Sequence, residues 1–101
     1  MSKADPRQQL QPVATALQEA LGDDLLALVL FGSRARGEAN PESDWDLLLL
    51  AENLPPSPWR RTQQMLTLLP QAWRHRVNIL AHTPAEIVAR VERLIEEVGD
   101  E

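Results

Sequence analysis

The stretch that decides the fold reads Gly32-Ser33-Arg34-Ala35-Arg36-Gly37 and then, ten residues after the serine, Asp44-Trp45-Asp46. Two short apolar runs border it, Leu25–Phe31 before the glycine and Leu47–Ala51 after the second aspartate. Apolar runs of this length, bounded by turn residues, are typical of buried β-strands. The stretch therefore predicts a glycine turn that ends one strand and two acidic residues that open the next.

The two acidic residues predict a cation site. Asp44 and Asp46 are two residues apart, so on a strand they share a face while Trp45 points to the other. Neighbouring carboxylates repel each other, and the usual remedy is a hard divalent cation, Mg²⁺ or Mn²⁺, that also binds substrate phosphates. An isolated Asp-X-Asp is more often a solvated strand edge, so the prediction depends on the glycine turn that accompanies it.

The glycine turn predicts a phosphate site. Gly32 permits close approach of the backbone, and Ser33 offers an amide and a hydroxyl to a phosphate. Arg34 and Arg36 are then candidates to contact the same polyphosphate, because a guanidinium binds phosphate through two hydrogen bonds. A lone Gly-Ser is usually only a tight turn, but here turn and acids fall at strand ends that can adjoin. Together they predict a nucleotide site.

These residues resemble the minimal nucleotidyltransferases of the DNA polymerase beta superfamily, from about Leu25 to Val98. The resemblance implies that Gly32 and Ser33 hold a triphosphate and that Asp44 and Asp46 bind the metal. It further implies transfer of AMP from ATP to a hydroxyl of a partner protein. Such proteins are often antitoxins encoded beside a toxin with a HEPN domain, so the resemblance also implies a HEPN-type partner.

One position departs from the family pattern. Active members generally carry a third acid on the next core strand, where this sequence has Asn78. No Asp or Glu occurs between Asn53 and Ala85, so no shift of the alignment supplies one. Asn offers a carbonyl oxygen to a cation but no charge. We therefore expect weakened transferase activity. The alternative is a catalytically degenerate antitoxin that acts by binding its toxin. A third interpretation, a plain structural α/β module, leaves the combination of glycine turn and acidic pair unexplained.

The remaining pattern predicts a small α+β domain at residues 10–101, after a flexible segment at 1–9. Apolar spacing predicts helices over Leu10–Leu21, from Pro58 to about Pro70, and from Pro84 to Val98, and a third strand over Arg76–Ala81. Only about a dozen residues join the first two strands, which is too short for a usual parallel crossover. We expect a mixed three-stranded sheet covered by helices.

Composition narrows the classes of function. With 101 residues, the chain is long enough for one domain, and any large acceptor needs a partner to hold it. The net charge of −5 disfavours general nucleic-acid binding, and no apolar run is long enough to span a bilayer. There is no cysteine and no leader-like pattern, so we expect a cytoplasmic protein.

The stretch from Asn53 to Ala85, which we call the acid-free block, contains the other candidate functional residues. We give them less weight than the glycine turn and the two acids. We interpret Arg60, Arg61, Arg74 and Arg76 as a solvated face or else as a docking surface for an acidic partner or RNA. His75 and His82 lack the spacing and acidic neighbours of a zinc site. For Trp59 and Trp73 we expect core or lid contacts, and for Glu86 and Arg90 an exposed mixed face.

Overall fold

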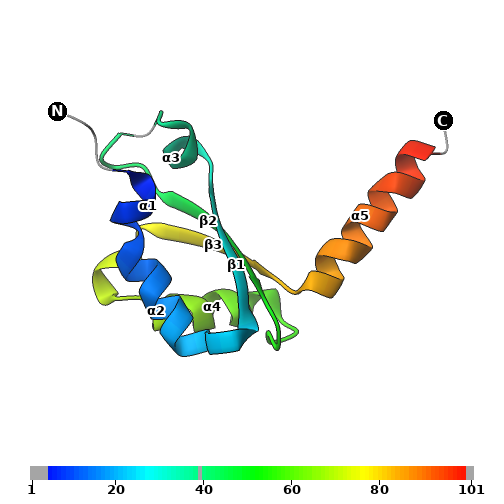
Figure 1. Ribbon diagram of the computed structural model, residues 1–101, viewed down its shortest axis with the longest axis horizontal. Coiled ribbons are helices and arrows are strands. Elements are labelled where there is room, and N and C mark those ends of the chain that lie inside the picture. Colours follow the sequence, from blue (N-terminus) through cyan, green and yellow to red (C-terminus); the bar gives the residue numbers. More distant parts are fainter. Residues whose placement is uncertain (1–4, 39, 100–101) are drawn as a thin grey trace.

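The computed structural model describes residues 5–38 and 40–99, with side chains as far as Leu94. Strands and helices alternate along the chain (Figure 1). The strands are β1 (Leu25–Phe31), β2 (Trp45–Ala51) and β3 (Val77–His82). The helices are α1 (Pro6–Gln9), α2 (Gln11–Leu21), α3 (Ser33–Arg36), α4 (Pro58–Leu68) and α5 (Pro84–Gly99), with 3-10 turns at Gly22–Asp24 and Gln71–Trp73. In the described part of the chain, no helix has both the length and the apolarity needed to cross a membrane.

The strands form one mixed sheet in the order β1-β2-β3. β2 lies in the centre and pairs antiparallel with β1 and parallel with β3. This confirms the predicted α+β class and mixed sheet. The register aligns Phe31 with Asp46 on one side and Asp46 with Asn78 on the other. The motif residues of the first two strands and the departure at position 78 therefore share one row at one end of the sheet.

One face of the sheet carries the core. Every second residue of β2 is buried, from Trp45 to Ala51, as expected for a strand whose alternate side chains point inward. Helices α2 and α4 pack on this face. The buried residues of α2, Val13 and Leu17, are four positions apart and therefore lie on one side of the helix. The buried cluster comprises Leu10, Val13, Leu17, Trp45, Leu47, Leu49, Ala51, Met65, Leu69, Val77 and Ile79.

The other face of the sheet is open, so the helices that flank the sheet cover only one of its faces. Val29 is 47% exposed and Leu80 is 54% exposed, although both point out of the middle of their strands. Helix α5 projects from the end of β3 instead of packing on the sheet (Figure 1). We call this side the open face; register and alternation assign to it Ala27, Val29, Phe31, Asp46, Leu48, Leu50, Asn78, Leu80 and His82.

The structure adds a short helix near the N-terminus, where the sequence predicted a flexible segment at 1–9. Residues 1–4 of that segment lie outside the described residues. Asp5 accepts a hydrogen bond from the Arg7 amide at 2.9 Å, and Pro6 occupies the first helical position of α1. Both are favourable at a helix start, because the cap pairs a free amide and proline needs no amide partner there.

Candidate functional site

Gly32 and Asp46 are in direct contact at the end of the sheet. Gly32 follows β1 with φ 77° and ψ −160°, a conformation that is essentially restricted to glycine. A Cβ atom at this position would overlap the Oδ2 atom of Asp46. The absence of a side chain at position 32 therefore lets the turn close onto the carboxylate. The approach of Gly32 to a phosphate stays a prediction.

Asp46 is held on its other side by Asn78. The two residues are register partners in the parallel pair, and the Asn78 side-chain amide donates to Asp46 Oδ1 at 3.1 Å. Asp46 is half-buried and Asn78 is exposed. One carboxylate oxygen thus faces Gly32 and the other accepts from Asn78, so the direction of the Asp46 carboxylate is set from two neighbouring strands.

Asp44 and Ser33 lie beside this pair with their polar groups available. Asp44 is exposed and precedes the first residue of β2, and Ser33 is half-buried at the first position of α3. Neither side chain has a hydrogen-bond partner within residues 5–38 and 40–99. Their roles as metal and nucleotide ligands stay predictions.

The two arginines after the glycine turn are engaged by the protein itself. Arg34 donates from Nε and Nη2 to the Ser43 carbonyl at 3.1 and 2.7 Å and from Nη2 to the Pro41 carbonyl at 3.3 Å. Its guanidinium carbon also lies 4.3 Å from the centre of the Trp45 ring. Arg36 is exposed and pairs with Glu38 at 3.0 Å. Arg34 therefore ties α3 to the loop that leads into Asp44, a positioning role that the sequence did not indicate.

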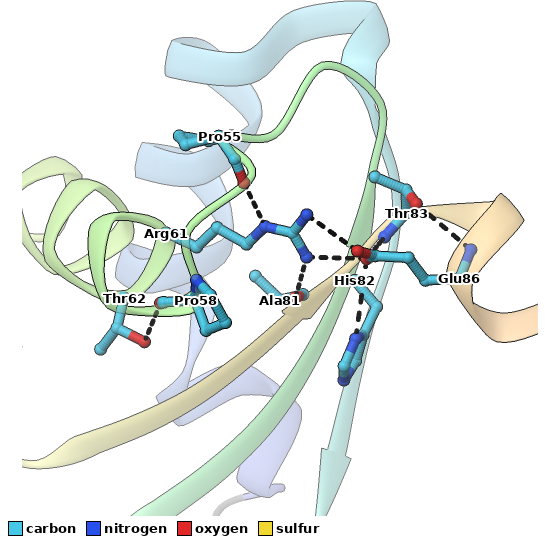
Figure 2. A network of polar contacts seen from close by, with 8 residues as sticks. All are labelled: Pro55, Pro58, Arg61, Thr62, Ala81, His82, Thr83 and Glu86. Atoms are coloured by element: carbon cyan, nitrogen blue, oxygen red, sulfur yellow. Dashed lines mark hydrogen bonds and ion pairs between the residues drawn. The ribbon is translucent and has the colours of Figure 1, made fainter. Parts of the chain in front are cut away.

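A second polar cluster lies at the opposite end of β3, where Arg61 of α4 meets Glu86 of α5 (Figure 2). Arg61 is only 7% exposed. Its Nη1 and Nη2 atoms donate to the two Glu86 carboxylate oxygens at 2.7 and 2.9 Å, and Nη1 also donates to the Ala81 carbonyl at 3.3 Å. Its Nε donates to the Pro55 carbonyl. The sequence prediction of a solvated face is wrong for Arg61, which is buried. Glu86 is exposed as predicted, although its carboxylate pairs with Arg61.

Glu86 also closes the cap of α5. Its Oε1 accepts from the Thr83 amide at 2.9 Å, and its own amide donates to Thr83 Oγ1 at 3.3 Å. This is the capping box expected from Thr83 and Glu86. Hydrogen bonds from Arg61 first, and from Thr83 second, lower the pKa of Glu86 to about 2. Glu86 is consequently ionised in the folded protein throughout the neutral range and serves the structure rather than the nucleotide site.

The other residues of the acid-free block have structural surroundings. Arg74 donates to the carbonyls of Leu69 and Thr67, and Arg76 lies over the Trp73 ring. Trp73 is half-buried and meets Trp45 edge-on with ring centres 5.8 Å apart. Trp59 is 70% exposed, so the core alternative is wrong for that residue and the lid contact stays a prediction.

The donor set fits a cation that arrives with a nucleotide. Within the described residues, no group of three or more His, Cys, Asp or Glu side chains is placed to hold a metal by itself. Two carboxylates on one sheet end remain, and Mg²⁺ typically binds through one or two carboxylates with phosphates and water completing its shell. The oriented Asp46 carboxylate is suited to that partial role.

The chain is similar to known proteins over most of its length. The family described as polymerase beta nucleotidyltransferase matches residues 13–95. A protein of Methanocaldococcus jannaschii, named as a candidate protein adenylyltransferase, is 55% identical over 38 residues, which are 38% of this chain and 26% of that protein. The crystal structure of a nucleotidyltransferase candidate from Sulfolobus solfataricus superposes with a TM-score of 0.57 at 20% identity, over 88% of this chain and 84% of the other. At that identity the likeness shows the fold.

Proposed function

Because the chain belongs to the polymerase beta nucleotidyltransferase family, we propose that it transfers AMP from magnesium-bound ATP to a hydroxyl of a partner protein. The observation that carries this proposal is the contact between the glycine turn and the Asp46 carboxylate. This contact supports the proposal because it brings the turn that would bind the phosphates against a carboxylate at one end of the sheet. The adenylyl group and the protein acceptor are taken from the name of the relative from Methanocaldococcus jannaschii.

In the proposed reaction the acceptor oxygen bonds to the α-phosphorus, the bond to pyrophosphate breaks, and the hydroxyl proton passes to water. When bound, Mg²⁺ supplies positive charge that offsets the charge of the phosphates and of the leaving pyrophosphate. Asp44 and Asp46 would hold it, Gly32 and Ser33 would position the phosphates, and Arg34 would keep the loop before Asp44 in place. Arg36, on the exposed side of α3, is the remaining candidate for a phosphate contact once its ion pair with Glu38 opens.

A second function is favoured by one specific contact. The Asn78 amide occupies one oxygen of Asp46, and Asn78 stands where a third carboxylate would add charge for a second cation. A site of this kind can bind nucleotide and turn over slowly or not at all. In that case the protein neutralises a HEPN-type toxin by forming a complex with it, and the nucleotide site is vestigial or regulatory.

The two functions are separated by incubating the protein with labelled ATP, Mg²⁺ and the product of the neighbouring gene. For the transferase we expect label on the partner, lost in Asp44→Asn and in Asp46→Asn. Asp23→Asn is the matched control. Asp23 is exposed just before the first residue of β1, at the end of that strand away from Gly32, and its replacement removes the same charge. A stable unlabelled complex that survives both site variants would support the binding function and contradict the transferase.

A further inference from the structure

Two apolar surfaces are exposed in the described part of the chain. The first is the open face, where Val29, Phe31 and Leu80 are at least 39% exposed. The second is the stripe formed on α5 by Val88, Val91 and Leu94, each at least 48% exposed. We call it the α5 stripe; its members recur every three residues and therefore lie on one side of the helix. Six of the eight exposed large apolar residues in the described part of the chain belong to these two surfaces.

Helix α5 is held away from the open face of its own chain. Only Thr83 separates β3 from α5, and the capping box ties it to the first turn of the helix. Arg61 comes from α4, which packs on the opposite face of the sheet, and it binds Glu86 through two hydrogen bonds (Figure 2). For α5 to fold over the open face of its own sheet, this buried guanidinium would have to lose its carboxylate, which is costly.

The shape of the chain is accordingly extended for its size. Its radius of gyration is 15.4 Å and its longest extent is 51 Å. A compact domain of about 100 residues has a radius of gyration of about 13 Å. Figure 1 shows the origin of the difference, since α5 leaves the body and points into solvent. A projecting helix with an exposed apolar stripe is expected to pack against another apolar surface.

We propose that two copies of this chain pair so that the α5 stripe of each covers the apolar part of the other's open face around Val29, Leu48 and Leu80, and leaves the end with Asp46 and Asn78 free for the nucleotide site. The dimensions agree: α5 has 16 residues, which is about 24 Å of helix, and strands of this length span about 20 Å. A helix about 10 Å wide that crosses about 20 Å of sheet covers about 200 Å² on each of the four surfaces, or about 800 Å² in all, which is the size of a weak or transient interface.

A second copy fits better than an unrelated partner for two reasons. A flat apolar sheet and an apolar helix stripe are complementary, and this chain carries both. A two-fold arrangement covers all four surfaces of the pair in one closed unit, and closed symmetry is the usual form of homo-oligomers. The α5 stripe is bordered by Arg90 on one side and by Glu92 on the other, which provides a polar rim of both signs.

The first test measures the mass of the full chain by sedimentation over a wide range of concentration. We expect a monomer–dimer equilibrium. Leu80→Glu on the open face and Val91→Glu on α5 should each raise the dimer dissociation constant at least about 30-fold, as hot-spot substitutions do. Trp59→Glu is the control, because Trp59 is more exposed than either residue but lies outside both surfaces. A monomer at every concentration, or a dimer that both variants leave intact, would overturn the proposal.

The second test uses the absence of cysteine in the native sequence. Protein carrying Leu80→Cys is mixed with protein carrying Val91→Cys under mild oxidation. We expect a disulfide between the two different chains, identified by mass, and none when Trp59→Cys replaces Leu80→Cys. These substitutions sit at exposed positions, so circular dichroism should match the native protein. Failure of the Leu80→Cys and Val91→Cys proteins to cross-link in a folded mixture would also overturn the proposal.

Discussion

Replacement of Gly32 by alanine adds only one methyl group. We expect it to disrupt the candidate site more than the addition of a methyl group at any other position. The added Cβ would overlap Asp46 Oδ2, and the backbone at φ 77° and ψ −160° would be strained as well. Strain of this kind costs on the order of 1–3 kcal/mol. Movement of the Asp46 carboxylate would also break its hydrogen bond with Asn78, worth about 1 kcal/mol.

Gly37 provides the matched control. It too has positive φ, at 73°, but a Cβ there would meet nothing within 4 Å. We expect Gly37→Ala to destabilise the fold by about 1 kcal/mol and Gly32→Ala by about 2–4 kcal/mol. Both variants gain the same stiffness in the unfolded chain, so that contribution cancels. The middle of these ranges gives a difference of about 2 kcal/mol in the free energy of unfolding. Because 1 kcal/mol corresponds to about 4–8 °C in a domain of this size, the two melting temperatures should differ by about 8–16 °C.

The assay combines thermal unfolding, followed by circular dichroism, with calorimetric titration of magnesium-bound ATP. Gly32→Ala should melt well below Gly37→Ala and lose measurable affinity for the nucleotide, whereas Gly37→Ala should keep it. If the two variants melt together and bind alike, the close approach of the turn to Asp46 is not what shapes the site, and the reasoning fails.

Four further changes test the remaining contacts. The pKa of Glu86 is lowered to about 2 in the folded state. The Glu86 carboxylate therefore stabilises the fold fully at any pH above its pKa in the unfolded chain, and this stabilisation is lost as the pH falls through its pKa in the folded protein. In urea titrations, Glu86→Gln should consequently flatten the loss of stability between about pH 5 and pH 2. Arg61→Ala should lower the free energy of unfolding by about 1–3 kcal/mol, below the range for fully buried pairs because Glu86 is partly exposed. Arg34→Lys should weaken nucleotide binding as much as Arg34→Gln, because the forked contacts with the loop carbonyls need a guanidinium; full affinity in the lysine variant would instead indicate a simple charge effect. Asn78→Asp should tighten Mn²⁺ binding, measured by electron paramagnetic resonance, and unchanged affinity would argue that position 78 does not face the cation.

Local pattern was sufficient for most of the fold. The strand of Trp45–Ala51 follows from a short apolar run that is bounded by turn residues, and the start of α5 follows from the capping box of Thr83 and Glu86. These signals involve neighbours within a few residues, whose preferences survive in almost any tertiary context. The glycine turn belongs to the same class, since a positive φ at position 32 has a local cause.

The long-range contacts were not predictable in this way. Arg61 and Glu86 are 25 positions apart, and Asn78 and Asp46 are 32 apart. Which arginine of the acid-free block becomes buried depends on where α4 settles on the sheet. Which side of the sheet stays open depends on the direction in which α5 leaves β3. Neither leaves a periodic mark in the sequence.

The sequence by itself determined the three strands, the helices α2, α4 and α5, the mixed sheet and the pairing of a glycine turn with two acids, because apolar pattern and short spacing encode them directly. Tertiary structure alone decided that the turn closes onto Asp46, that Asn78 holds the same carboxylate, and that Arg34 faces the loop. The physical reason is that strand register and the choice of charge partner follow from the free energy of packing the whole chain. That packing also left the open face and the α5 stripe uncovered.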